Sequence, residues 1–140
     1  MRHAPLAATV LCLGGMLFEP ASLPPVPVSA AAPAAPEPNA EVKFFRQKIE
    51  PVLRDHCYEC HSRDAEELKG ELRLDTREGR LKGGPNGPAV VPGDVSASFL
   101  MRALRYTEDD YKMPPRGRLD DAVLQDFETW IKRGAIDGEK

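Results

Sequence analysis

The residues of this chain best suited to chemistry are two cysteines and a histidine, in the order Cys57-Tyr58-Glu59-Cys60-His61. This C-x-x-C-H pattern is typical of covalent haem attachment. Each thiol adds to one vinyl group of the porphyrin, so the two sulfurs must lie along one edge of the ring. The histidine that follows is then placed to bind the iron as its proximal ligand. The motif predicts Cys57 and Cys60 as thioether sites and His61 as the proximal iron ligand.

Three other interpretations of these five residues remain open. A zinc site needs four ligands, but beyond the N-terminal forty residues the chain offers only His56 in addition to the motif. A thioredoxin-like dithiol is expected in a βαβ setting, which the flanking sequence does not supply. A structural disulfide or a chance match is the third. Haem attachment is favoured because the chain also carries an export signal, and haem is attached covalently outside the cytoplasm.

A second iron ligand is expected from a methionine. Met113 lies in a segment where Pro114 and Pro115 stiffen the backbone directly after it. Such a rigid loop could hold a thioether over the iron. Met101 lies in a predicted helix, where methionine usually fills the core. We therefore predict Met113 as the distal ligand, with Met101 and His56 as alternatives.

The first forty residues differ in composition from the rest. They hold eight of the fourteen prolines and three charged side chains. A positive start, an apolar run over residues 6–18 and small residues near Ala30 predict a signal peptide over residues 1–30. Residues 31–40 are predicted to be an Ala/Pro-rich flexible spacer. The protein is therefore expected to be exported, in the periplasm or otherwise outside the cytoplasm, with membrane contact only if the leader is retained.

The charge of the remaining chain is nearly balanced. Residues 41–140 hold 18 Lys and Arg against 20 Asp and Glu, a net charge of −2. No basic stripe is present, so nucleic acid is not expected as a partner. Cationic side chains that could dock a redox partner protein or pair with haem propionates are Lys112, Arg116, Arg118, Arg73, Arg77 and Lys82. For the first three, a solvated surface is the favoured interpretation, because acidic residues 108–110 precede them directly.

A first helix is predicted over residues 41–50, with Asn39 as its N-cap and apolar side chains along one face. Pro51 is expected to impose a kink or a fresh helical turn, since its ring clashes with the carbonyl four residues earlier. Either outcome would deliver the C-x-x-C-H motif in a compact turn.

Two further main helices are predicted. Residues 96–104 follow Asp94 and Ser96, either of which could be the N-cap. The last helix is expected between Asp120 and Arg133, with Gly134 ending it. Between the first and second helices we predict a short extended piece at residues 72–74, a capping box at 75–78 and a loop over 79–92.

Several blocks of this sequence together resemble a known family. They are Phe44-Phe45, Ile49–Leu53, His56–Ser62, Gly70–Asp75, Gly87–Asp94, Lys112–Pro115 and Trp130-Ile131. Over residues 41–138 the chain resembles the planctomycete-type cytochrome c domain. The resemblance implies a small, class I-like, all-α fold with three main helices and long loops wrapped around one covalently attached haem c. It also implies thioethers at Cys57 and Cys60, with His61 and Met113 as iron ligands.

The function implied is single-electron transfer with redox partner proteins, by a carrier rather than an enzyme. Two alternatives stay open. One is a haem-based sensor or peroxidase-like module with a labile sixth ligand. The other is the electron-entry domain of a larger exported protein, since in that family the domain usually opens a much longer chain and this sequence stops at Lys140.

Overall fold

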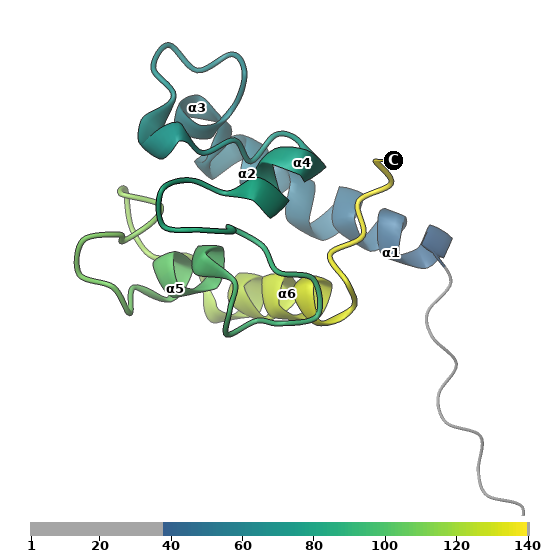
Figure 1. The fold of residues 1–140 in the computed structure, drawn as a ribbon. Coiled ribbons are helices and arrows are strands. Elements are labelled where there is room, and N and C mark those ends of the chain that lie inside the picture. Colours follow the sequence, from purple (N-terminus) through teal and green to yellow (C-terminus); the bar gives the residue numbers. More distant parts are fainter. Residues whose placement is uncertain (1–37, 140) are drawn as a thin grey trace, which may run out of the picture. The chain divides into compact units, whose positions relative to one another are not determined.

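The computed structural model describes residues 38–139, so the predicted signal peptide and most of the predicted spacer lie outside the described residues. The prediction of an all-α fold is confirmed, since no sheet forms over this part of the chain. None of its helices is long and apolar enough to cross a membrane. The helices are α1 (Pro38–Phe44), α2 (Glu50–His56), α3 (Tyr58–His61), α4 (Arg77–Lys82), α5 (Phe99–Arg105) and α6 (Asp121–Lys132) (Figure 1).

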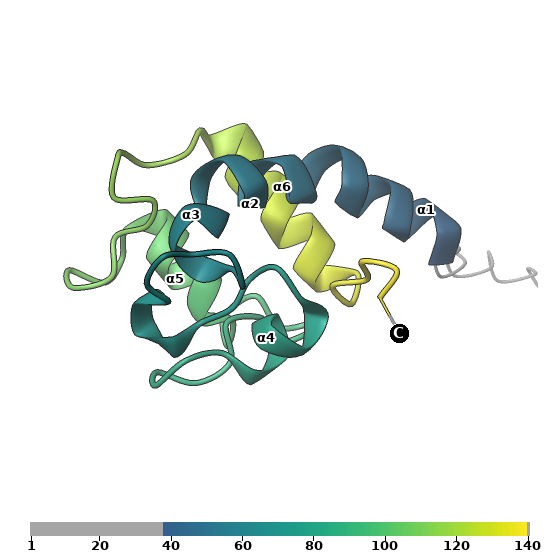
Figure 2. The same cartoon turned by 90° about the horizontal axis from the view of Figure 1, so that it is seen from above.

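α1 and α2 form one continuous rod, joined by a π-helical turn at Phe45–Ile49 (Figures 1 and 2). The Glu50 N–H bonds the carbonyl of Phe45, five residues back. After this wider turn α2 starts at Glu50, so Pro51 falls in the first turn of α2, where a missing N–H costs little. The prediction of Asn39 as N-cap was wrong. Asn39 lies inside α1, which the structure describes from Pro38 onward, and so it is a helical residue rather than a cap.

α6 follows the prediction closely. Its buried side chains Leu124, Phe127, Trp130 and Ile131 recur at helical spacing and form one apolar face. Past its C-terminal end, the Gly134 N–H bonds the Ile131 carbonyl and the Ala135 N–H bonds the Trp130 carbonyl. This is the Schellman arrangement, and Gly134 supplies its positive φ of 97°.

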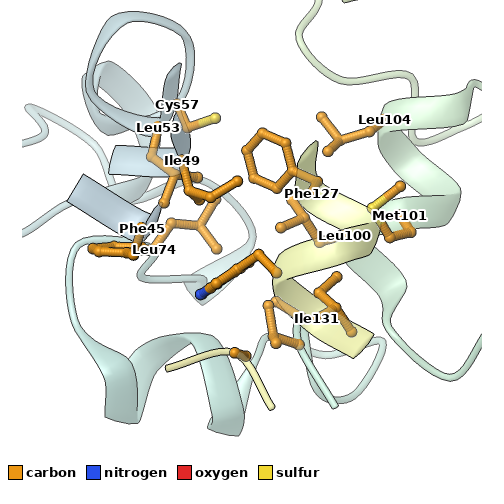
Figure 3. Close-up of a cluster of buried hydrophobic side chains, with 14 of the residues drawn as sticks. Phe45, Ile49, Leu53, Cys57, Leu74, Leu100, Met101, Leu104, Phe127 and Ile131 are labelled. Carbon is orange, nitrogen blue, oxygen red and sulfur yellow. The ribbon is translucent and has the colours of Figure 1, made fainter. Parts of the chain in front are cut away.

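The core lies where α6 packs against the π-helical turn and α5 (Figure 3). The rings of Phe45 and Trp130 lie 5.4 Å apart, centroid to centroid. Phe127 is fully buried and, in Figure 3, lies between Ile49 of the first rod and Leu104 of α5. This contact sets the position of the first rod, which leads into the C-x-x-C-H motif, relative to α6 and the α5 helix packed on it.

The starts of α4 and α5 differ from the predictions. The cap of α4 is Thr76, whose hydroxyl accepts the Gly79 N–H, and α4 replaces the first part of the predicted 79–92 loop. Asp75 is instead bonded to Arg73. α5 begins only after Ser98. The Asp94 carboxylate accepts the N–H groups of residues 96 and 97 and so closes a separate turn before the helix.

A buried ion pair joins α4 to the C-terminal segment. The side chains of Arg80 and Asp137 are 2% and 1% exposed, and the guanidinium also donates to the Leu74 carbonyl at 2.6 Å. Removing one member of such a pair leaves the other charge buried without its partner. The pair therefore makes the C-terminal segment part of the folded unit.

We expect Asp137→Ala to lower the free energy of unfolding by about 3–5 kcal/mol, the cost typical of a broken buried ion pair. Urea unfolding of the haem-loaded protein measures it. The matched control is Asp121→Ala, which removes an exposed pair with Arg118 and should cost about 1 kcal/mol at most. Equal losses in the two variants would contradict the assignment.

Candidate functional site

The C-x-x-C-H segment forms a single helical turn, α3, directly after the first rod. The N–H groups of Cys60 and His61 both bond the carbonyl of Cys57, at 3.1 and 2.9 Å. Residues three apart on a helix lie on the same side. The turn therefore places both cysteine side chains on one side, as attachment to one edge of a porphyrin requires.

Segment 72–74 hydrogen-bonds both the ring and the backbone of His61. Its Nδ1 lies 3.3 Å from the Leu72 carbonyl oxygen, and its own carbonyl accepts the Leu74 N–H at 2.7 Å. A carbonyl can only accept, so Nδ1 carries the proton and Nε2 is left free to bind a metal. Burial keeps the pKa of His61 below its usual range, although hydrogen bonds to backbone carbonyls partly oppose this. A neutral, oriented imidazole is the form that ligates iron.

The two cysteines are free thiols. Burial, helped by the nearby Cys60, raises the pKa of Cys57 to about 12. A thioredoxin-like dithiol requires the opposite, a thiol whose pKa is lowered so that it reacts as a thiolate. The environment of Cys57 therefore does not favour the redox-dithiol interpretation.

Met113 lies on the irregular segment between α5 and α6 and is half-buried. Its N–H donates to the Ala103 carbonyl of α5 at 3.1 Å, which ties the segment to the helix. Met101 points elsewhere: it is fully buried in the core and does not line the cavity described next. Of the two methionines, only Met113 lies at the candidate site.

One cavity of about 640 Å³ brings the four predicted residues together: Cys57, Cys60, His61 and Met113 all line it. This volume falls in the range of small-molecule and cofactor pockets. Most of its wall is apolar, and the apolar lining residues include Leu72, Leu74, Phe99, Leu100, Ala103 and Leu104. Over residues 38–139, no three His, Cys, Asp or Glu side chains gather closely enough to hold a metal ion alone. The donors are spread around an apolar space, which fits a large flat cofactor better than a compact zinc centre.

Residues 57–117 match the family model described as planctomycete cytochrome C. The matched segment runs from the first cysteine of the motif to just beyond the loop that carries Met113. Over this segment the chain is similar to planctomycete cytochrome C. The family implies a covalently bound haem, for which Cys57 and Cys60 have the required spacing. Neither the comparison with curated proteins nor that with solved structures gives a match.

Of the six cationic side chains that the sequence offered as partners of a redox protein or of haem propionates, only Arg116 lines the cavity. Its guanidinium pairs with Glu59 at 2.9 Å and so links the Met113 segment to the attachment motif. The other five do not line the cavity. Lys69, which no sequence motif marks, is a further cationic residue on the wall. The suggestion that residues 73, 77 and 82 pair with haem propionates stays a prediction, since these side chains lie off the cavity wall.

The loop that follows α4 forms another part of the cavity wall. Gly84 lies so close to the preceding wall segment that a Cβ there would stand 2.4 Å from the Gly70 carbonyl oxygen. A larger residue would push the two segments apart. Residues 84–87 and Ala89 of the predicted 79–92 loop thus border the cavity, in agreement with the prediction of a Gly- and Pro-rich loop wrapped around a cofactor or surface.

Besides Lys69, the sequence did not predict three contributors to the site: the Leu72 carbonyl, the apolar face of α5, and Tyr106 at the end of α5. The Leu72–Leu74 alternation signalled an extended segment but not its partner. The hydroxyl of Tyr106 donates to the carbonyl of Pro114. No local pattern marks that bond, because it joins a helix end to a loop eight residues later.

Proposed function

We propose that this chain is an exported monohaem c-type cytochrome that transfers single electrons. Cys57 and Cys60 carry the haem through thioether bonds, His61 is the proximal iron ligand and Met113 is the distal ligand. The observation that carries the proposal is the single apolar cavity on which these four side chains meet.

Haem bound in this cavity supplies an iron that is oxidised and reduced by one electron. The chain's own residues then set its properties. The Leu72 carbonyl orients the His61 ring, and the Ala103 carbonyl anchors the backbone of Met113. A methionine ligand raises the reduction potential relative to a second histidine. With both axial positions filled by protein, no iron site is left for a substrate, so the domain serves as a carrier.

The proposal also covers the cellular location of the protein and its partners. A signal peptide over residues 1–30 would direct the chain out of the cytoplasm, where haem is attached to C-x-x-C-H motifs. Its partners would be other redox proteins that exchange electrons with the haem. One haem per chain is proposed because the sequence holds one such motif.

The test is a pyridine haemochrome spectrum of the full chain, exported in a host with the c-type maturation machinery. We expect a c-type spectrum, haem that survives denaturation, and reversible one-electron reduction in a redox titration. A matured, folded protein without haem would refute the cytochrome proposal and return zinc or a disulfide at the two cysteines to consideration.

A sensor or peroxidase-like module is the second candidate, and one feature favours it. Met113 lies on a segment without regular structure between α5 and α6, so its thioether could be exchanged. Carbon monoxide separates the two functions. A carrier should bind it weakly because Met113 occupies the iron, whereas a sensor or peroxidase-like site should take it up readily.

A further inference from the structure

Tyr106 ends α5 in an unusual backbone conformation. Its φ and ψ are 61° and 31°, the left-handed region that glycine or asparagine normally occupies at a helix end. A bulky aromatic residue is disfavoured there. A strained position that keeps an unfavourable residue suggests that the side chain has a use.

The side chain of Tyr106 reaches the segment that carries Met113. Its hydroxyl donates to the carbonyl of Pro114, the residue directly after Met113. The same carbonyl accepts the Gly117 N–H at 3.3 Å. Pro114 is buried and Tyr106 half-buried, so the bond is shielded from bulk water. This hydrogen bond holds the backbone directly C-terminal to Met113, the predicted iron ligand.

The two ends of the intervening loop also meet at one acceptor. The Ala103 carbonyl accepts the N–H of Tyr106 at 3.2 Å and the N–H of Met113 at 3.1 Å. Met113 is therefore fixed before its Cα by Ala103 and after it by the Tyr106 hydroxyl. The hydrogen bond from the Met113 N–H to the Ala103 carbonyl involves backbone atoms alone, so a substitution at position 106 leaves it in place. The hydrogen bond to the Pro114 carbonyl requires the tyrosine hydroxyl at position 106.

We propose that Tyr106 is a positioning residue that holds Met113 at the sixth coordination position. This rests on the proposed His/Met ligation. Without the hydroxyl, the Ala103 anchor remains and the fold is kept, but the Met113 side chain leaves the iron more easily. The effect is on ligand exchange rather than on haem attachment.

Cyanide binding to the ferric, haem-loaded full chain tests the proposal, because the external ligand binds only when Met113 has left. We expect Tyr106→Phe to accelerate cyanide binding about tenfold, the factor expected for one lost hydrogen bond. The matched control is Tyr111→Phe. Tyr111 lies in the same loop, is 39% exposed and packs edge-on against Phe99 at the cavity wall. Its hydroxyl takes part in no hydrogen bond within residues 38–139, so Phe removes an oxygen without removing a bond. This control should bind cyanide at the parent rate.

Met113→Ala separates a failure of this proposal from a failure of the proposed ligation. If Met113→Ala binds cyanide no faster than the parent, Met113 is not the ligand and the proposed function fails at that point. If Met113→Ala is fast while Tyr106→Phe matches the parent, the positioning role is overturned. Tyr106→Asn gives a second route should the Phe variant mature poorly, because asparagine tolerates the left-handed backbone and lacks the phenol. It too should accelerate binding, and a parent-like rate would overturn the role.

Discussion

Replacing both Cys57 and Cys60 by alanine is expected to leave the exported protein without covalently bound haem. No other cysteine lies in the mature chain that we predict, so no thioether can form. The apolar cavity would then lack the cofactor that fills it, in a domain whose size makes its own core only marginally sufficient. A pyridine haemochrome assay after denaturation should fall to background, and circular dichroism should show reduced helical content.

The control for this double variant is His56→Ala. His56 directly precedes the motif and lines the same cavity, but it is exposed and lies outside the C-x-x-C-H pattern. It should retain the parent's content of covalent haem. Haem that stays bound to the double variant through denaturation would rule out thioether attachment at Cys57 and Cys60.

Met113→Ala should lower the reduction potential on the order of 0.1 V or more, within the range of roughly 0.8 V that axial ligands span. The variant loses the thioether and opens one side of the iron. Carbon monoxide should therefore bind the reduced variant tightly, whereas it binds the parent weakly. Redox titration and carbon monoxide difference spectra measure the two effects.

Met101→Leu is the matched control, because it changes the other methionine of the described chain. Met101 is fully buried in the core, away from the cavity, and leucine nearly conserves its volume. Its potential should equal that of the parent. If Met101→Leu shifts the potential and Met113→Ala does not, the assignment of the distal ligand is reversed.

Haem-attachment chemistry and the strongest helix are readable from the sequence because both depend on neighbours close along the chain. The spacing of Cys57, Cys60 and His61 is set within one helical turn, which backbone hydrogen bonds close locally. α6 is equally local: its apolar residues recur at the helical period and Gly134 supplies the conformation that ends it. Such features need no knowledge of the rest of the fold.

Helix starts were predicted less well, because several nearby side chains compete for each cap. Asp75 and Thr76 are both residue types that favour the N-cap position. The Asp75 carboxylate accepts hydrogen bonds from Arg73, and Thr76 caps α4 instead. Asp94 and Ser96 precede α5, but Asp94 closes a turn upstream and the helix starts after Ser98. In each case a competing hydrogen bond of similar strength decided the boundary.

Only the tertiary structure decided which distant residues meet. The choice between Met101 and Met113 depends on which one faces the cavity, and that depends on how α5 packs against α6. The Leu72 carbonyl under His61 and the Tyr106 hydroxyl on Pro114 likewise follow from the path of the chain between helices. The predicted attachment of haem could be read from the sequence alone, because the C-x-x-C-H motif on which it rests is short-range. The surroundings of His61 and Met113 depend on packing, because the residues that contact them are distant in the chain. Several polar groups could make such contacts, and only the path of the folded chain selects among them.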